Sequence, residues 1–550
     1  MRSRAGCQLT WLRSHVYIGC VFRGLALRVP MGTATGATAL AAVIAAFACL
    51  LPSDAQAAKP KLRDVLLVGN NWDGTADVLD VPSYERLRRI NVVPDLAERL
   101  AENLTPERLP WATFVREQVG EGHDQMVDDL YASKDGRTLY VSRPSFDDVV
   151  AIDMGSGQII WRTVLTGVRA DHMAISPDGT RLVVSTAAAA GPQVVNVLDS
   201  ATGTMVGTFP SGDSPHENNF SRDGSLIYHA SIGRVYTPTD EPALDATKGD
   251  RVFEIVDAHT LQVLKKWDMG KKLAEAGYPN MSSAVRPMAL SPDEKWLYFQ
   301  VSFFHGFVEF DLQNERVMRV ANLPTSDATP ANREDYILDS GHHGIAMNGE
   351  GTKLCVAGTV DNYAAIVHRD DFSYLIHPLG ARTYWATSSA DGHYCYVSVA
   401  GDDTMSIISY ASEQEIARVP VGDHPQRART ARVSTAIFGF PPANRKRARL
   451  LSLRAKLAGK RKLRLRGRLV LPKGSKACRG TVRLYVRRGG AIVDLSRTRL
   501  RRTRRRCVYS RAITLSREAA KPGRVVANAR FVGNDSLLPR RAKPRSVRVG

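Results

Sequence analysis

Cysteine is scarce in this chain of 550 residues, with 7 in all, so a small scaffold held by a dense disulfide network is excluded. The sequence also lacks a Gly-x-Ser-x-Gly elbow, a phosphate-binding P-loop and a protein-kinase motif set, which removes the enzyme classes that those motifs mark. No apolar run reaches the ~20 residues that a membrane-spanning helix needs. The chain as a whole is 44% hydrophobic and 24% charged, a composition too apolar for a disordered protein.

Acidic residues are almost missing from the last fifth of the chain. Residues 441–550 contain 35 Lys and Arg but only 3 Asp and Glu, whereas the preceding residues contain 40 basic and 52 acidic side chains. The sequence therefore predicts a mildly acidic body followed by a separate, strongly basic domain.

One apolar run lies near the N-terminus, at residues 38–51, and a small-x-small site follows at residues 55–57. This pattern is typical of a signal peptide, so we expect residues 1–57 to be a leader and the mature chain to be exported. An uncleaved membrane anchor is the alternative, and either Met1 or Met31 can be the start.

A turn signal of the type Ser-x-Asp-Gly recurs along the body at intervals of 41 to 70 residues. Its six copies begin at Ser133, Ser176, Ser221, Ser291, Asn348 and Ser389. Short β-rich runs follow each copy and make four strands per unit. A period near forty with four strands per unit predicts a β-propeller, because a β-sandwich lacks such repetition and a solenoid usually has a shorter period.

The six turns give six complete blades, and the two ends of the module supply a seventh. Residues 65–95 contain three strands without a preceding turn, and residues 428–435 can supply the missing inner strand. Pairing the two ends would remove exposed sheet edges. We therefore predict an all-β chain in which residues 58–437 form a seven-bladed β-propeller.

The units resemble YVTN-type propeller repeats. The resemblance is carried by DHMAISPDGTRLVVS at 171–185, RPMALSPDEKWLYF at 286–299 and HHGIAMNGEGTKLCVAG at 342–358. It implies the propeller fold and leaves the function open. Similar propellers include surface and periplasmic binding proteins, lactonase-like enzymes and the large subunits of quinone-dependent amine dehydrogenases.

Four long connections interrupt the repeat, at residues 100–127, 234–250, 270–287 and 322–343. Each should join strands at the end of the propeller opposite the Asp-Gly turns, which we call the top face. Long loops on a rigid scaffold usually carry function, so we expect a binding face there for a small molecule or a protein.

The segment at 215–220 departs most from the repeat, because polar residues replace small or apolar ones. Buried polar residues need partners, which a ligand or an internal hydrogen-bond network can supply. The candidate ligand-binding residues are His216, Glu217, Asn219, His229 and Arg234.

Histidines also recur where inner strands begin and approach the central channel. The weaker metal candidates are His172, His216, His343 and His424, and such imidazoles suit Cu or Zn. The alternative is that each histidine only closes a loop onto its strand. No catalytic residue and no cofactor is identified by the sequence.

After a linker at 438–448, residues 449–550 alternate apolar residues with Arg, which indicates antiparallel strands. A length of about 100 residues suits a small Ig-like β-sandwich. The segment ANARFVGNDSLLP at 527–539 resembles the end of bacterial Ig-like domains. Cys478 and Cys507 should pair there. In the propeller, Cys355 and Cys395 lie four and three residues after their turn glycines, so we expect them on opposite faces, buried and unpaired.

We expect an exported, non-enzymatic binding propeller, retained at the cell envelope because its basic domain binds an anionic cell-wall polymer. Export and the lack of an aromatic-interleaved RNA motif argue against a nucleic-acid partner. An extracytoplasmic enzyme, either a lactonase-like hydrolase or an amine-dehydrogenase-like subunit, is the alternative. GC-rich codon usage is another source of the arginines.

Overall fold

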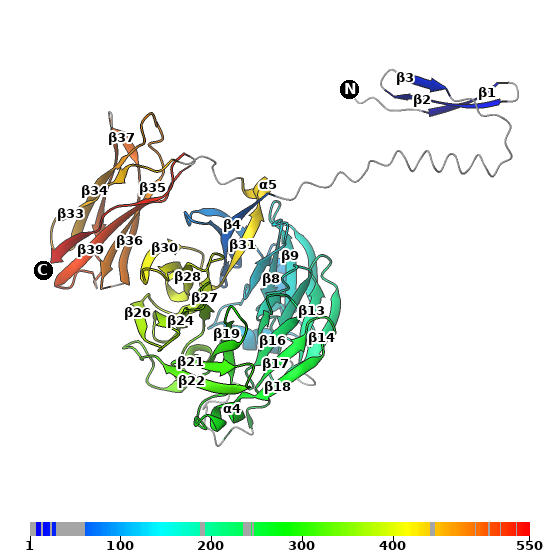
Figure 1. The fold of residues 1–550 in the computed structure, drawn as a ribbon, viewed down its shortest axis with the longest axis horizontal. Coiled ribbons are helices and arrows are strands. Elements are labelled where there is room, and N and C mark those ends of the chain that lie inside the picture. Colours follow the sequence, from blue (N-terminus) through cyan, green and yellow to red (C-terminus); the bar gives the residue numbers. More distant parts are fainter. Residues whose placement is uncertain are drawn as a thin grey trace. The chain divides into compact units, whose positions relative to one another are not determined.

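The computed structural model describes residues 7–12, 15–22, 25–28, 61–187, 193–234, 244, 247–439, 446–489, 491–503, 506–517, 519–534 and 536–550. It divides the chain into two compact units, residues 1–60 and 61–550 (Figure 1). The first unit contains one antiparallel sheet of β1 (Cys7–Leu12), β2 (His15–Phe22) and β3 (Leu25–Arg28). The predicted apolar run at 38–51 and cleavage site at 55–57 lie outside the described residues.

Most of the second unit consists of four-stranded antiparallel sheets arranged as propeller blades (Figure 1). Blade 1 contains β7 (Leu130–Ala132), β8 (Thr138–Arg143), β9 (Asp148–Asp153) and β10 (Ile159–Val164), and blade 2 contains β11 (Met173–Ile175), β12 (Arg181–Ser185), β13 (Val194–Asp199) and β14 (Met205–Pro210). Blade 3 contains β15 (Pro215–Phe220), β16 (Leu226–Ser231), β17 (Val252–Asp257) and β18 (Val263–Asp268), and blade 4 contains β19 (Val285–Leu290), β20 (Trp296–Val301), β21 (Gly306–Asp311) and β22 (Arg316–Asn322). Blade 5 contains β23 (Ile345–Met347), β24 (Lys353–Gly358), β25 (Tyr363–His368) and β26 (Tyr374–Pro378), and blade 6 contains β27 (Thr383–Ser388), β28 (Tyr394–Val399), β29 (Thr404–Ser409) and β30 (Gln414–Pro420).

The seventh blade is assembled from both ends of the module, as the sequence predicts. Its inner strand is β31 (Pro425–Ser434), which pairs with β4 (Leu62–Asn70) and is followed outward by β5 (Thr75–Asp80) and β6 (Arg86–Asn91). The inner strands contact one another in order around a closed ring, and β31 lies between β27 and β7. The predicted fold class, with seven blades, is confirmed.

The repeated turn signal is a self-contained hydrogen-bonded unit. In blade 2 the Ser176 hydroxyl donates to the Asp178 carboxylate, which also accepts from the amide of Thr180 at 3.0 Å. Gly179 has a φ of +80°, which a glycine adopts without strain. The strands that follow are buried on both faces because neighbouring blades cover them, so β12 is almost continuously apolar.

The long connections all join strands at the same end of the blades. The connection before blade 1 contains α2 (Leu96–Asn103), α3 (Leu109–Phe114) and the short π-helix η1 (Val115–Val119). The connection before blade 4 contains α4 (Met269–Glu275), and the one before blade 5 contains the 3-10 helices η4 (Arg333–Asp335) and η5 (Ile337–Asp339). The connection after β16 joins the second and third strands of its blade, which also end at the top face. Shorter elements are η2 (Pro144–Phe146), η6 (Ala400–Asp402) and α5 (Thr435–Phe438).

The C-terminal region forms two five-stranded sheets. One contains β32 (Leu450–Leu451), β33 (Arg454–Leu457), β34 (Lys462–Val470), β37 (Arg501–Thr503) and β38 (Arg506–Thr514), and the other contains β35 (Thr481–Arg488), β36 (Ala491–Arg499), β39 (Gly523–Phe531), β40 (Arg540–Arg541) and β41 (Arg545–Val549). Buried residues of both sheets, such as Leu465 and Leu484, share one core. Cys478 and Cys507 form the predicted disulfide, with their Cα atoms 5.5 Å apart.

The expectation that Cys355 and Cys395 are unpaired is wrong. They form a disulfide between β24 of blade 5 and β28 of blade 6, with a Cα–Cα distance of 6.3 Å. Their side chains do lie on opposite faces of their own sheets. In a propeller, however, the trailing face of one blade packs against the leading face of the next, so opposite faces bring the two sulfurs together.

Two disulfides indicate an extracytoplasmic location, because thiols stay reduced in the cytosol. Among the described residues, none of the helices has both the length and the apolar composition to cross a membrane.

Candidate metal centre

The channel is lined by residues that stand at one recurrent position, at or just before the start of each inner strand. One or more come from every blade, namely Asp128, Asp129, Asp171, His172, His216, Glu217, Arg286, His343, Tyr384, Trp385 and Arg427. All of them are buried. His172 of blade 2 reaches His343 of blade 5, with ring centroids 5.9 Å apart, and residues of blades that are not neighbours can meet only at the propeller axis.

Three imidazoles form a cluster at this point, which we call the channel triad: His172, His216 and His343. One ring nitrogen from each lies within 4.8 Å of the others. The rings of His172 and His216 lie 3.8 Å apart, and those of His216 and His343 lie 5.7 Å apart. Each residue is 1% exposed. The arrangement therefore brings three nitrogen donors together in a buried environment.

The triad has unsatisfied hydrogen-bonding capacity. Nδ1 of His216 and Nδ1 of His343 are buried and have no hydrogen-bond partner within the chain. His172 differs, because its Nδ1 contacts the buried Glu217 carboxyl, which leaves Nε2 as its remaining nitrogen donor. Buried polar atoms without partners are uncommon and call for an explanation.

Carboxylates and arginines surround the triad in nearly equal number. Asp171 lies 4.0 Å from Nε2 of His172, and Asp128, Asp171 and His172 form a second group of converging donors. Arg427 donates to Asp128 at 2.9 Å and lies 4.3 Å from the Trp385 ring. Pairing with Asp128 offsets part of the charge of this arginine.

Burial is the main cause of the unusual ionisation in the channel. It lowers the pKa of each triad histidine well below the ordinary value, and the neighbouring guanidinium groups lower it further. Burial also raises the pKa of Glu217 to about 8 and that of Asp128 to about 7. The three imidazoles are therefore neutral at physiological pH, which is the form that binds metals.

The fourth histidine of the predicted metal set lies elsewhere. His424 stacks on Trp72 at 3.8 Å, and His123 stacks on the same indole at 3.9 Å. Both rings are nearly parallel to the indole, so Trp72 lies between them. His424 is thus part of an aromatic stack at the end of blade 7.

The predicted ligand-binding set is only partly brought together. His216 and Glu217 line the channel, and the Asn219 amide donates to Glu217 at 3.2 Å. His229 lies on β16, where its ring bonds Asn218 of the adjacent strand β15 at 2.9 Å and Ser211, in the connection between β14 and β15, at 2.7 Å. Arg234 is exposed at the start of the connection after β16.

A second histidine cluster lies under the top face of blade 5. Both His305 Nδ1 and His342 Nε2 bond one oxygen of Asp361, at 2.7 and 2.9 Å, and Tyr336 bonds the other nitrogen of His305 at 2.8 Å. Thr329 and Ser326 also bond Asp361. Because most donors and acceptors are paired, this cluster anchors the connection before blade 5 to its blade.

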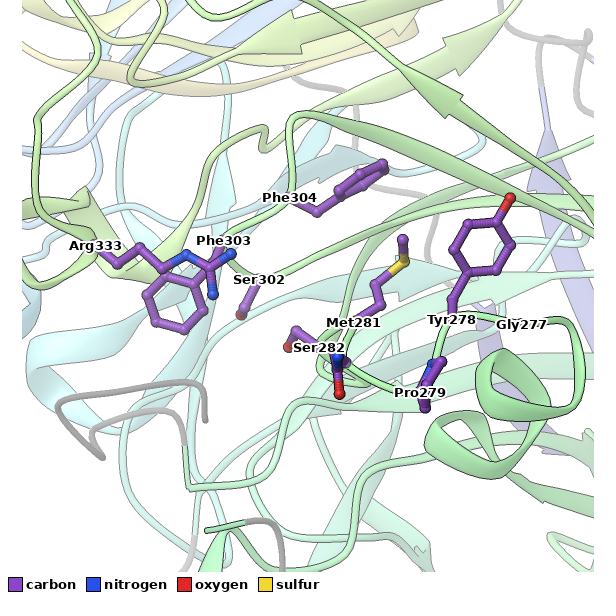
Figure 2. A pocket seen from close by; sticks show the side chains of 10 residues that line it. Gly277, Tyr278, Pro279, Met281, Ser282, Ser302, Phe303, Phe304 and Arg333 are labelled. Carbon is purple, nitrogen blue, oxygen red and sulfur yellow. The ribbon is translucent and has the colours of Figure 1, made fainter. Parts of the chain in front are cut away.

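A pocket of about 310 Å³ opens on the top face among three connections (Figure 2). Phe303 and Arg333 lie on one side, Tyr278 lies on the other, and Ser282 and Ser302 lie between them. The guanidinium of Arg333 is 5.8 Å from the Phe303 ring. The pocket thus combines aromatic walls with a cation.

The channel residues of blades 1 to 6, including those that sequence reasoning missed, share a simple signal. Counted from the first residue of each repeated turn, Asp128, Asp171, His216, Arg286, His343 and Tyr384 all stand five positions upstream. His172 and Trp385 stand four positions upstream. Aligning the six turn-bearing blades on their turns would have found the ring except for Arg427 of blade 7, whereas a search for histidines found only part of it.

Neither a family model nor a curated protein matches this chain. Among solved structures, a chain of hydrazine synthase from Kuenenia stuttgartiensis is similar over 63% of this chain and 92% of its own length. The identity is 17% and the TM-score is 0.44. A similarity of this degree concerns the fold alone.

Proposed function

We propose that this chain is an exported binding propeller whose channel triad holds a divalent transition-metal ion such as Zn²⁺ or Cu²⁺. One observation carries the proposal: three buried imidazoles direct nitrogen donors within 4.8 Å of one another, and two of these rings have a nitrogen without a partner. An unsatisfied buried polar group costs about 1–3 kcal/mol. A metal ion would supply the missing partner for such rings and offset that cost.

The donor set suits a late transition metal better than a hard cation. Imidazole nitrogen is a preferred ligand of Zn²⁺ and Cu²⁺, whereas Ca²⁺ and Mg²⁺ take oxygen ligands. Tetrahedral donors ~2.1 Å from zinc lie roughly 3.4 Å apart, so small side-chain shifts would bring the triad to bonding distance. Asp171 is the nearest candidate for a fourth ligand, and Glu217 would orient the His172 ring from outside.

A binding role fits this site better than catalysis. A catalytic metal keeps a position open to its substrate, but each triad residue is only 1% exposed. The same burial argues against a catalytic site in the channel, either that of a lactonase-like hydrolase or that of an amine-dehydrogenase-like subunit.

The proposal also covers export, the repeat family and retention at the cell envelope. The YVTN-like repeats, the leader and the disulfides support an exported propeller, and the basic C-terminal sheets are proposed to be an Ig-like domain that retains it at the cell envelope. The top-face pocket offers a second site, for a small molecule with an aromatic group and an acidic group, because Arg333 stands beside its aromatic walls.

The experiment compares metal uptake by the full-length exported protein and two variants. His216→Gln removes one triad donor while keeping similar volume. His377→Ala is the matched control, because His377 is buried and both its ring nitrogens lack partners, yet it belongs to no donor cluster among the described residues.

After chelator treatment, each protein is titrated with Co²⁺, Zn²⁺ and Mg²⁺ while visible absorption and thermal stability are recorded. We expect Co²⁺ to give a d–d absorption band and Zn²⁺ to raise the melting temperature in the wild type and in His377→Ala, but not in His216→Gln. Equal responses in all three proteins, or a response to Mg²⁺ alone, would refute the proposal. A melting temperature raised by small anions and not by Zn²⁺ would instead assign the channel to an anionic ligand.

A further inference from the structure

The outer face of the first C-terminal sheet presents an ordered array of positive side chains. In β34, Lys462, Arg464, Arg466 and Arg468 are exposed, and they alternate with inward positions that are buried leucines except at Gly467. Since alternate residues of a strand share a face, these four side chains stand in one row, about 6.6–6.8 Å from one to the next.

Neighbouring strands extend this row into a surface. Arg454 of β33 lies directly opposite Arg466, and Lys456 lies directly opposite Arg464. On the other side, β38 and β37 add Arg506 and Arg501 to the same face through their registers with β34. We call the eight side chains the cationic face: Arg454, Lys456, Lys462, Arg464, Arg466, Arg468, Arg501 and Arg506.

The cationic face is electrostatically unfavourable in isolation. Like charges directly opposite in an antiparallel pair are destabilising, and two such pairs occur side by side in β33 and β34. The other side chains on this face are Leu450, Val470, Thr503, Val508, Ser510, Ala512 and Thr514, none of them acidic. Within the described part of the chain, no ion pair joins any of the eight cations.

Other arginines of the same region do have structural partners. Arg461 donates to the Leu515 carbonyl at 2.6 Å, and Arg545 donates to the Leu453 carbonyl at 3.1 Å. Arg488 donates to the Ala519 carbonyl at 3.2 Å. Stabilisation of the sheets therefore explains these arginines but not those of the cationic face, which point to an external partner.

We propose that the cationic face binds an extracytoplasmic anionic polymer that carries closely repeated phosphate groups. Charge complementarity carries the inference: six arginines and two lysines in a regular array can each meet a phosphate, and guanidinium groups bind phosphate in a bidentate manner. The disulfides place this surface outside the cytosol. No aromatic side chain stands on the face, so it lacks the stacking platform that proteins use for single-stranded nucleic acid.

The test measures binding of the full-length protein to inorganic polyphosphate over a range of salt concentrations. The variant Arg464→Gln/Arg466→Gln/Arg468→Gln removes three charges from the cationic face. The matched control, Arg137→Gln/Arg222→Gln/Arg316→Gln, removes three exposed arginines from the propeller. Circular dichroism confirms that both variants fold.

We expect the logarithm of the wild-type affinity to fall with the logarithm of salt concentration with a slope of about −5.6, from eight contacts at ~0.7 each. The face variant should bind at least ~10-fold more weakly, with a slope smaller in magnitude by about 2, and the control should bind like the wild type. Equal losses in both variants would overturn the proposal, as would no measurable binding in ~0.1 M salt. Tighter binding to double-stranded DNA than to polyphosphate would also overturn it and assign the face to nucleic acid.

Discussion

Glu254 provides a sharp test of the packing inside blade 3. It lies in β17 with 1% of its surface exposed, and its Oε2 has no hydrogen-bond partner. Its one ion-pair partner, Lys266 of β18, is 3.4 Å from Oε1 and is itself largely exposed. Burial raises the pKa of Glu254 to about 7, and Lys266 offsets only part of this effect.

The sign of the pH effect follows from this raised pKa. Between the unfolded pKa of 4.5 and the folded pKa of about 7, the native protein holds more protons than the unfolded chain. The contribution of Glu254 to the unfolding free energy is therefore at its maximum below pH 4.5 and falls as the pH rises through about 7. The loss between pH 5 and pH 8 is about 2.5 kcal/mol, because one pKa unit corresponds to ~1.4 kcal/mol.

Glu254→Gln removes this titration while keeping the shape of the side chain. Relative to the wild type, we expect the variant to gain about 2.5 kcal/mol in unfolding free energy between pH 5 and pH 8. For a propeller of roughly 370 residues, this corresponds to about 3 °C in melting temperature. Calorimetry of both proteins at the two pH values measures the difference.

Glu315→Gln is the control, because Lys265 and Trp267 lower the pKa of the exposed Glu315, so it is ionised throughout that range. The difference between Glu315→Gln and the wild type should be the same at pH 5 and pH 8. A constant difference for Glu254→Gln as well would refute the reasoning about Glu254.

Two further predictions concern the scaffold. Replacing both Cys355 and Cys395 by Ser removes a disulfide that closes a loop of 40 residues, so the unfolding free energy measured with urea should fall by about 4 kcal/mol. Reductant should cause no further loss of stability at this site in the variant. An unchanged unfolding free energy would contradict the inter-blade disulfide. Arg143 is fully buried and bonds Asp95 at 2.6 Å and Asp148 at 2.7 Å. Arg143→Gln should therefore lower the unfolding free energy by about 3–5 kcal/mol and speed proteolysis within residues 96–119. Cleavage of the variant at the wild-type rate would contradict this anchoring role.

The fold was predictable because its signals are local and repeated. The Ser-x-Asp-Gly turn closes its own hydrogen bonds, as Ser176 and Asp178 show, so it marks each blade regardless of the rest of the chain. The split blade followed from counting strands at both ends, and β31 pairs with β4 as expected. The unpaired state predicted for Cys355 and Cys395 failed because pairing depends on contacts between blades, which the strand pattern of one blade does not contain.

The candidate site was predictable only in part. Three of the four weak metal candidates lie together in the structure, but histidine recurrence could not separate them from His424, which stacks on Trp72, a residue from the other end of the propeller sequence. His229 looked like a site residue because it is polar in an apolar strand, yet its partners are Asn218 of its own blade and Ser211 of the connection that leads into that blade. Which polar residues face the axis depends on the closed ring, a property of all seven blades together.

The most direct test of the central claim is the metal content and metal-edge X-ray absorption spectrum of the full-length protein purified without added metal or chelator. The channel triad predicts close to one Zn or Cu ion per chain, with about three imidazole nitrogens ~2.0–2.1 Å from it, and a loss of that ion in His216→Gln. A protein that carries no transition metal and also takes up none on titration would contradict the claim, as would a metal bound by oxygen ligands alone.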